Sequence, residues 1–121
     1  MRDLLYLLAS AIATAEGWYH PDPLVVPRRL HNPGNLRASP LERPKDQGYV
    51  RFQNDQEGIA ALYHQIAKHV LRGMTLRQLI SAWAPPAEND TENYIRETAR
   101  RCGISDVDRP LMEFLAVERI S

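Results

Sequence analysis

The placement of proline restricts this chain more than any other feature. Between residues 17 and 54, prolines stand at positions 21, 23, 27, 33, 40 and 44, which is six of the nine in the chain. Proline removes a backbone donor and clashes with the preceding helical turn, so no continuous helix can cross this stretch. Loops of this length are usually functional or disordered, and the aromatic and apolar residues here favour an ordered loop. Residues 48–52 alternate weakly and predict one short strand or an extended arm.

The apolar residues before this stretch predict a first helix over residues 4–15, ended by Glu16. Its expected buried face consists of five residues at helical spacing: Leu4, Leu5, Leu8, Ile12 and Ala15. The same segment is similar to a secretory signal, because Ala13-Thr14-Ala15 has the form of a cleavage site. We favour a retained helix over a cleaved signal, since Asp3 neutralises the amino-terminal charge and cleavage would leave Glu16 in a frayed terminus.

Two helices are predicted directly after the loop. Asn54 and Glu57 form a capping-box pattern, and Gly73 closes the helix that follows. The apolar stripe of that helix is Ile59, Leu62, Tyr63, Ile66 and Val70. Thr75 and Gln78 form a second capping box, which opens a short helix that runs to Trp83 and stops before two prolines.

Two more helices complete the prediction. Asn89 or Asp90 caps the first of them, and Gly103 ends it. Its apolar residues are Tyr94, Ile95, Thr98, Ala99 and Cys102. A last helix is expected over residues 108–120. We therefore predict an all-α fold in which residues 1–121 form a single compact domain of about five helices. One long ordered loop, which could hold a short β-strand, follows the first helix.

The charge balance argues against nucleic acid as a partner. Fifteen basic and fifteen acidic side chains cancel, so no overall field draws the chain to nucleic acid or to an anionic membrane. No apolar run approaches the length of a membrane span. Cys102 is the only cysteine, and His20, His31, His64 and His69 show no metal-ligand spacing. We expect a monomer without a metal or another cofactor.

Glu16 gives the clearest chemical signal in the sequence. It ends an apolar helix and is followed at once by Gly17, Trp18 and Tyr19, with the amide-rich and cationic segment 32–37 further on. A carboxylate at a helix C-terminus is unfavourable by about 0.3–1 kcal/mol when exposed, so stability alone does not explain an acid here. Apolar and aromatic surroundings favour the neutral form of a carboxylic acid. We expect Glu16 to keep its proton near neutral pH and to donate it to a glycosidic oxygen.

Other residues could contact a ligand, and Asn35 and Arg37 each allow two interpretations. Asn35 is either the left-handed residue of a turn after Pro33-Gly34 or an amide that binds an N-acetyl group or a water. Arg37 is either a solvated cation or a ligand contact. Trp18 and Tyr19 suit stacking on sugar faces, whereas Trp83, at the end of an apolar stripe, is expected in the core.

The order of these parts resembles a known family. A helix ending in Glu-Gly is followed by Asn32-Pro-Gly-Asn-Leu-Arg37, then by Phe52 with Gly58-Ile-Ala-Ala-Leu62, and later by Trp83-Ala-Pro85 and Glu88-Asn-Asp-Thr91 before Tyr94. This succession resembles the phage- and prophage-associated branch of the lysozyme-like superfamily, which is related to the lytic transglycosylases that cut peptidoglycan. It covers roughly residues 9 to 105. The larger transglycosylases carry a Gly-Leu-Met-Gln type of segment where Asn-Pro-Gly-Asn stands here.

The resemblance implies a role for each matched residue. Glu16 matches the catalytic acid at the end of the family's first helix, and the segment from Asn32 through Asn35 to Arg37 matches the loop that lines the sugar cleft. Tyr94 resembles the tyrosine that approaches the acid from a later helix. The implied substrate is the β-1,4 bond between N-acetylmuramic acid and N-acetylglucosamine in peptidoglycan strands. The implied place of action is the bacterial cell wall or periplasm, and the protein would be phage- or prophage-encoded.

The mechanism depends on whether a second carboxylate assists. Retaining and inverting hydrolases use two acids, yet no acid stands at helical spacing from Glu16. A transglycosylase with one catalytic Glu fits best, and hydrolysis in which Asp22 or Asp46 positions a water is the fallback. A non-catalytic glycan-binding or virion structural protein of lysozyme-like fold is the alternative class. A nucleic-acid-binding helical module is a third reading, and the zero net charge argues against it.

Overall fold

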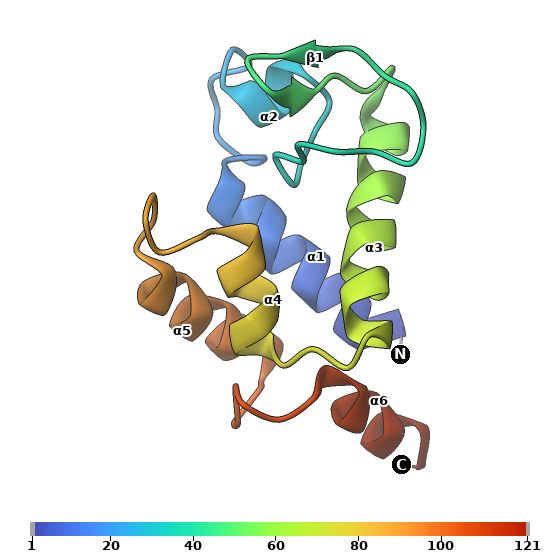
Figure 1. Cartoon of the computed structure of the whole chain (residues 1–121), viewed down its shortest axis with the longest axis vertical. Helices are drawn as coiled ribbons and strands as arrows, with labels where there is room; N and C mark the ends of the chain where they lie inside the picture. Colours follow the sequence, from blue (N-terminus) through green and yellow to red (C-terminus); the bar gives the residue numbers. More distant parts are fainter. Residues whose placement is uncertain (1, 121) are drawn as a thin grey trace. The chain divides into compact units, whose positions relative to one another are not determined.

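The computed structural model describes the backbone of residues 2–120 and the side chains of residues 4–115. The described residues are mostly helical, as predicted, with six helices and one two-stranded sheet (Figure 1). The elements are α1 (Arg2–Glu16), α2 (Val26–Arg29), β1 (Lys45–Asp46), β2 (Tyr49–Val50), α3 (Asp55–Leu71), α4 (Leu76–Trp83), α5 (Thr91–Cys102) and α6 (Leu111–Ile120).

The chain divides into two compact units. Met1–Ala11 with Ile66–Ser121 form one, here called the helical unit, and Ile12–Gln65 form the other, called the loop unit. The predicted single domain over residues 1–121 stays a prediction.

The helical unit follows the predicted signals closely. Thr75 and Gln78 exchange both hydrogen bonds of a capping box at the start of α4. Gly73, which follows α3, and Gly103, which follows α5, both adopt positive φ, of 84° and 68°. The buried side chains of this unit come from all of its helices and include Leu4, Leu8, Ile66, Val70, Leu76, Leu79, Ile80, Ile95, Leu111 and Leu115. The Thr91 hydroxyl donates to the Ala84 carbonyl, which joins the start of α5 to the end of α4.

The last helix begins later than predicted, at Leu111 rather than at residue 108. Asp106 accepts a hydrogen bond from the Asp108 amide at its carboxylate, and its carbonyl accepts one from the Arg109 amide. Pro110 then forms an isolated antiparallel bridge with Thr75. These turn and bridge contacts hold residues 106–110 out of helical geometry, so α6 starts after the proline.

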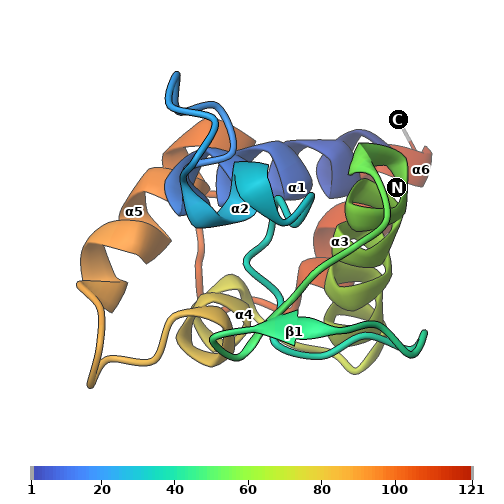
Figure 2. The same ribbon diagram turned by 90° about the horizontal axis from the view of Figure 1, so that it is seen from above.

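The loop unit contains two elements that the sequence analysis missed. The one-turn helix α2 has Pro27 in its first turn, where a missing donor costs nothing. It lies beside the C-terminal end of α1 in both views (Figures 1 and 2), and a Cβ at Gly17 would sit 3.7 Å from Pro27 Cγ. The predicted strand is β2, but it is one half of an antiparallel hairpin with β1. Gln47 and Gly48 turn the hairpin with φ values of 52° and 88°.

On α1 and α3, two residues of the predicted apolar faces are in fact exposed. Ala15 is exposed near the end of α1, and Ile59 is 38% exposed on α3. On α3 the buried residue of that turn is Gly58, because a loop carbonyl occupies the space over it. At the start of α3 the Asn54 side chain accepts from the Glu57 amide, and the Glu57 carboxylate accepts from Arg43 and from the Gln53 amide.

Candidate functional site

Glu16 is the last residue of α1 and is half-buried in the loop unit. The helix ends there because Gly17 takes a φ of 96°, and the Trp18 amide then donates back to the Ala13 carbonyl at 2.9 Å. The Asn35 side-chain nitrogen donates to Glu16 Oε1 at 2.9 Å and to the Glu16 carbonyl oxygen at 3.3 Å. One amide therefore caps the end of the helix and orients the acid.

Asn35 is itself held in an uncommon backbone conformation. Its φ is 49°, as predicted for the left-handed residue of a turn after Pro33-Gly34. Its backbone amide donates to the Asn32 carbonyl at 3.1 Å. Oδ1 of Asn35 is buried and accepts no hydrogen bond within the described residues. The predicted contact of the Asn35 side-chain amide with an N-acetyl group stays a prediction.

Asn32 anchors the turn that presents Asn35. Its side chain is fully buried, donates to the carbonyls of Leu36 and Val50 at 3.0 and 2.9 Å, and accepts from the Leu36 amide at 2.8 Å. The predicted substrate contact by Asn32 is therefore corrected to a supporting role, because its side chain has no exposed surface. The Val50 amide donates to the Leu36 carbonyl at 2.9 Å, which further ties the turn to β2.

A close approach to α3 fixes the other side of the turn. A Cβ placed on Gly58 would lie 1.8 Å from the His31 carbonyl oxygen, so only glycine fits there. His31 has a φ of 54°, and its Nδ1 lies 2.7 Å from Asp55 Oδ1 at the start of α3. The Phe52 amide donates to the Leu30 carbonyl at 3.0 Å. The long loop is thus an ordered structure built against α3 and β2.

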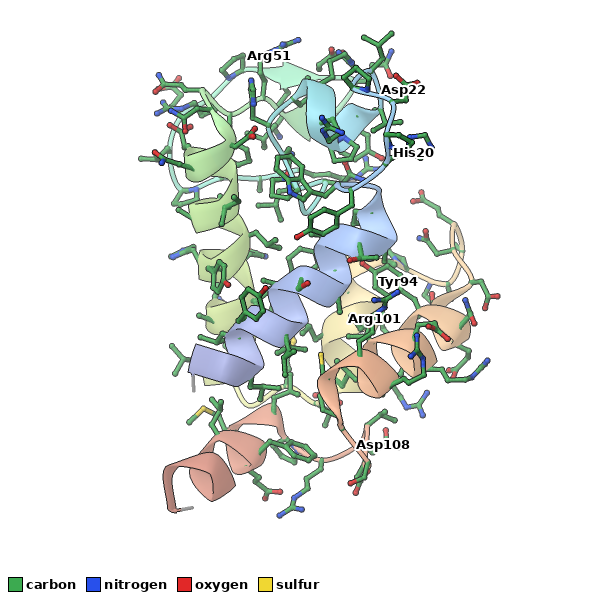
Figure 3. All side chains as sticks on the ribbon, turned by 180° about the vertical axis from the view of Figure 1, so that it is seen from behind. His20, Asp22, Arg51, Tyr94, Arg101 and Asp108 are labelled. Atoms are coloured by element: carbon green, nitrogen blue, oxygen red, sulfur yellow. The ribbon has the colours of Figure 1, made fainter. Side chains whose placement is uncertain are left out.

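Three other carboxylates of the loop unit make contacts of their own, among them the two proposed to position a water, Asp22 and Asp46. Asp46 accepts from Arg29 at 2.5 Å and from Arg51 at 3.4 Å, and the hydrogen bond from Arg29 lowers the pKa of Asp46. Arg43 donates to both oxygens of Glu57, at 2.6 and 3.0 Å, and this contact lowers the pKa of Glu57. Asp22 accepts from the Leu24 amide at 2.9 Å and lies next to His20 in the loop after α1 (Figure 3).

The predicted aromatic and cationic contacts lie in different environments. Trp18 is half-buried and Tyr19 is 65% exposed, directly after the acid in sequence. Arg37 is exposed, with its guanidinium carbon 4.7 Å from the centroid of the Tyr49 ring. Tyr94 is half-buried on α5, in the helical unit (Figure 3). Its predicted approach to Glu16 stays a prediction.

The two remaining candidates for reactivity belong to the helical unit. Burial raises the pKa of the Cys102 thiol to about 11, so the unreactive neutral form dominates at physiological pH. Burial, followed by the charges of Lys68 and Arg72, lowers the pKa of His69. Within the described residues, no three His, Cys, Asp or Glu side chains are grouped so that they could hold a metal ion.

Sequence reasoning identified Glu16, Asn35 and the turn around them, but it missed their pairing. Asn after Pro-Gly predicts a left-handed turn residue, whereas the hydrogen bond to Glu16 depends on the path of the whole loop. The Arg43–Glu57 pair left no sequence signal, because its members are far apart in the chain. Among the described residues, none of the helices is both long and apolar enough to cross a membrane. No protein-family model matches this chain, and no curated protein or solved structure shows significant similarity to it.

Proposed function

We propose that this protein is a lysozyme-like enzyme that cleaves the β-1,4 bond between N-acetylmuramic acid and N-acetylglucosamine in peptidoglycan. It acts as a lytic transglycosylase with Glu16 as its one catalytic acid. The observation that carries the proposal is the hydrogen bond from Asn35 to Glu16 Oε1, at 2.9 Å. It fixes the orientation of a half-buried carboxyl group that stability alone would not place at a helix C-terminus.

The proposed reaction needs one acid in two roles. Glu16 donates its proton to the glycosidic oxygen, and the bond to the anomeric carbon of the muramic acid breaks. The acetamido group of the substrate stabilises the positive charge at that carbon. Glu16, now a carboxylate, removes the proton from the C6 hydroxyl of the same sugar, and that oxygen bonds to the anomeric carbon. The product carries a 1,6-anhydro ring, and Glu16 is protonated again.

The contacts of the other acids support the one-acid reaction over hydrolysis. A water-activating base must be ionised and able to turn toward a water. Asp46 is ionised, but Arg29 and Arg51 hold it, and Arg43 holds Glu57 through both oxygens. Asp22 accepts a hydrogen bond from the backbone of its own turn. Each of these three carboxylates therefore has a structural role that explains its presence without a part in catalysis.

The loop after α1 supports a saccharide as the substrate. Trp18 and Tyr19 follow the acid directly, and aromatic faces stack well on the CH-rich faces of sugars. Under this proposal the partner is a glycan strand of the bacterial cell wall, and Tyr94 is a further residue that we expect to contact it. The protein acts as a monomer without a cofactor and is of phage or prophage origin.

Cleavage of purified peptidoglycan sacculi tests the proposal. The native protein should release muropeptides whose mass shows 1,6-anhydro ends, and Glu16→Gln should lower the rate by about 10²- to 10⁴-fold. Glu42→Gln is the matched control, because Glu42 is an exposed acid of the same unit, and it should behave as the native protein. Products with reducing ends instead of 1,6-anhydro ends would show that the enzyme hydrolyses the bond and is not a transglycosylase. Binding to sacculi without any product would favour the non-catalytic glycan-binding class.

A further inference from the structure

Arg37 is held in place by an aromatic ring instead of an acid. Its guanidinium carbon lies 4.7 Å from the centre of the Tyr49 ring, and its Nη2 donates to the Tyr49 hydroxyl at 3.2 Å. The left-handed turn residue Gly48 lies beside it, where an added Cβ would be 3.6 Å from Nη1. The hairpin therefore limits the freedom of a side chain that is exposed to solvent.

The charge on Arg37 has no acidic partner among the described residues, which sets it apart from Arg29, Arg43 and Arg51. Arg29 and Arg51 bind Asp46, and Arg43 binds Glu57. Arg28 donates to the His20 carbonyl oxygen at 2.7 Å. Stacking on a phenol orders a guanidinium without neutralising it, so Arg37 presents an ordered positive charge with donors suited to a carboxylate.

The position of Arg37 connects it to the acid. It stands two residues after Asn35, whose amide binds Glu16, so the Cα atoms of Asn35 and Arg37 are at most about 7 Å apart. All of these residues belong to the loop unit. The turn that carries the hydrogen-bond partner of Glu16 therefore also carries Arg37.

We propose that Arg37, ordered by Tyr49, binds a carboxylate on the muramic acid side of the substrate. The protein then selects carboxylate-bearing peptidoglycan glycans over neutral polymers of N-acetylglucosamine. This inference rests on the proposed function and adds a specificity determinant to it. The carboxylate comes either from the lactyl group of a muramic acid without a stem or from the stem peptide itself.

Binding measurements on the Glu16→Gln protein test the inference without turnover. The ligands are a hexamer of N-acetylglucosamine, a stem-free alternating glycan of the same length, and the same glycan with its stem peptides. Adding Arg37→Gln should weaken binding of a carboxylate-bearing glycan by about tenfold or more and leave the neutral hexamer unchanged. Arg37→Lys keeps the charge but not the planar pair of donors, so its loss of affinity for the carboxylate-bearing glycan should lie between no loss and the full loss of Arg37→Gln.

The controls separate this contact from general charge and from loss of folding. Arg51→Gln removes a cation of the same hairpin that is paired with Asp46, so it should leave all three affinities unchanged. Thermal unfolding of each variant checks the fold. Loss with the stem-free glycan identifies the lactyl carboxylate, and loss only with the stem-bearing glycan identifies the peptide.

Three results would overturn the inference: equal weakening of all ligands, no weakening of any, or no binding of any glycan by the Glu16→Gln protein. The sacculus assay stays independent, because it reads bond cleavage by the native chain. If Arg37 discriminates between the glycans but the native protein releases no muropeptide, the proposed enzymatic activity is refuted and the proposed carboxylate contact stands.

Discussion

The Glu16 side chain accepts from a neutral amide, whereas Asp46 and Glu57 of the same unit accept from arginines. Arg43 holds Glu57 with a full positive charge, which keeps that carboxyl group ionised. Asn35 supplies a donor to Glu16 without any charge. An amide can fix the direction of a carboxyl group in both of its protonation states, which a group that first donates and then accepts a proton requires.

Asn35→Asp should disable the proposed enzyme while preserving its fold. The substitution keeps the size of the side chain and tolerates the left-handed backbone, but it replaces the donor to Glu16 with a carboxylate. Misdirection of the acid should lower the rate of muropeptide release by about 10- to 100-fold. Asn89→Asp makes the same chemical change at an exposed site in the helical unit and should leave the rate unchanged. An Asn35→Asp protein with the native rate would show that this contact does not serve catalysis.

Residue types predicted backbone conformation well and side-chain partners poorly. The local signals were predicted correctly, because each depends on a few adjacent residues. They are the positive φ values of Gly73, Gly103 and Asn35 and the capping box at Thr75. Asn32 was predicted to contact substrate, and it is instead fully buried between the turn and β2. Its role depends on residues 18 positions away, which no local pattern encodes.

At the scale of elements, the sequence predicted the long helices and strand β2 but missed α2 and β1. Helices α3, α4 and α5 carry enough turns for an apolar period to appear. Helix α2 is four residues long and strand β1 is two residues long, so neither is long enough to show a period. The hairpin turn at Gln47-Gly48 also lacks the Asn-Gly or Asp-Gly pair that would have indicated it.

Helix α3 is adapted to the loop at one residue, Gly58. Gly58→Ala should destabilise the protein by about 2 kcal/mol, because the clash with the His31 carbonyl outweighs the gain of about 1 kcal/mol in helix propensity. Denaturant unfolding measures the change. Because His31 precedes the turn that carries Asn35, muropeptide release should also fall.

Gly73→Ala is the matched control for this substitution. A Cβ at Gly73 meets no atom within 4 Å, so its cost is limited to the positive φ, at about 1 kcal/mol, and the activity should stay close to native. A Gly58→Ala protein as stable as the native one would mean that the turn can move away from α3 freely. In that case the turn would not hold Asn35 in a fixed place.

At the scale of the whole molecule, the net charge is zero and several of the charged side chains form specific pairs. Arg77 of the helical unit donates to Glu92 and to Asp108, both at 2.8 Å. Arg29, Arg43 and Arg51 of the loop unit bind Asp46 and Glu57. Single exposed pairs contribute little to stability. Among these paired acids, Asp46 and Glu57 are less exposed than Glu92 and Asp108. Their arginine partners lower the pKa values of Asp46 and Glu57, so lowering the pH should reveal what these two pairs contribute to the free energy of unfolding.

The free energy of unfolding should therefore fall as the pH drops. The pKa of Glu57 is lowered from 4.5 and that of Asp46 from 3.8, so the unfolded chain takes up protons first. Their contribution is present above these ordinary values and is lost as the pH falls toward the lowered ones. Burial also lowers the pKa of His69 from 6.5, so the decline should begin below that pH. Denaturant titrations at pH 7, 5 and 3 measure it. Glu57→Gln should be less stable than the native protein at pH 7, and the difference should shrink as the pH falls toward the lowered pKa of the native Glu57 carboxyl group. A difference that stays constant over this range would show that the ionised Glu57 carboxylate adds nothing to folding.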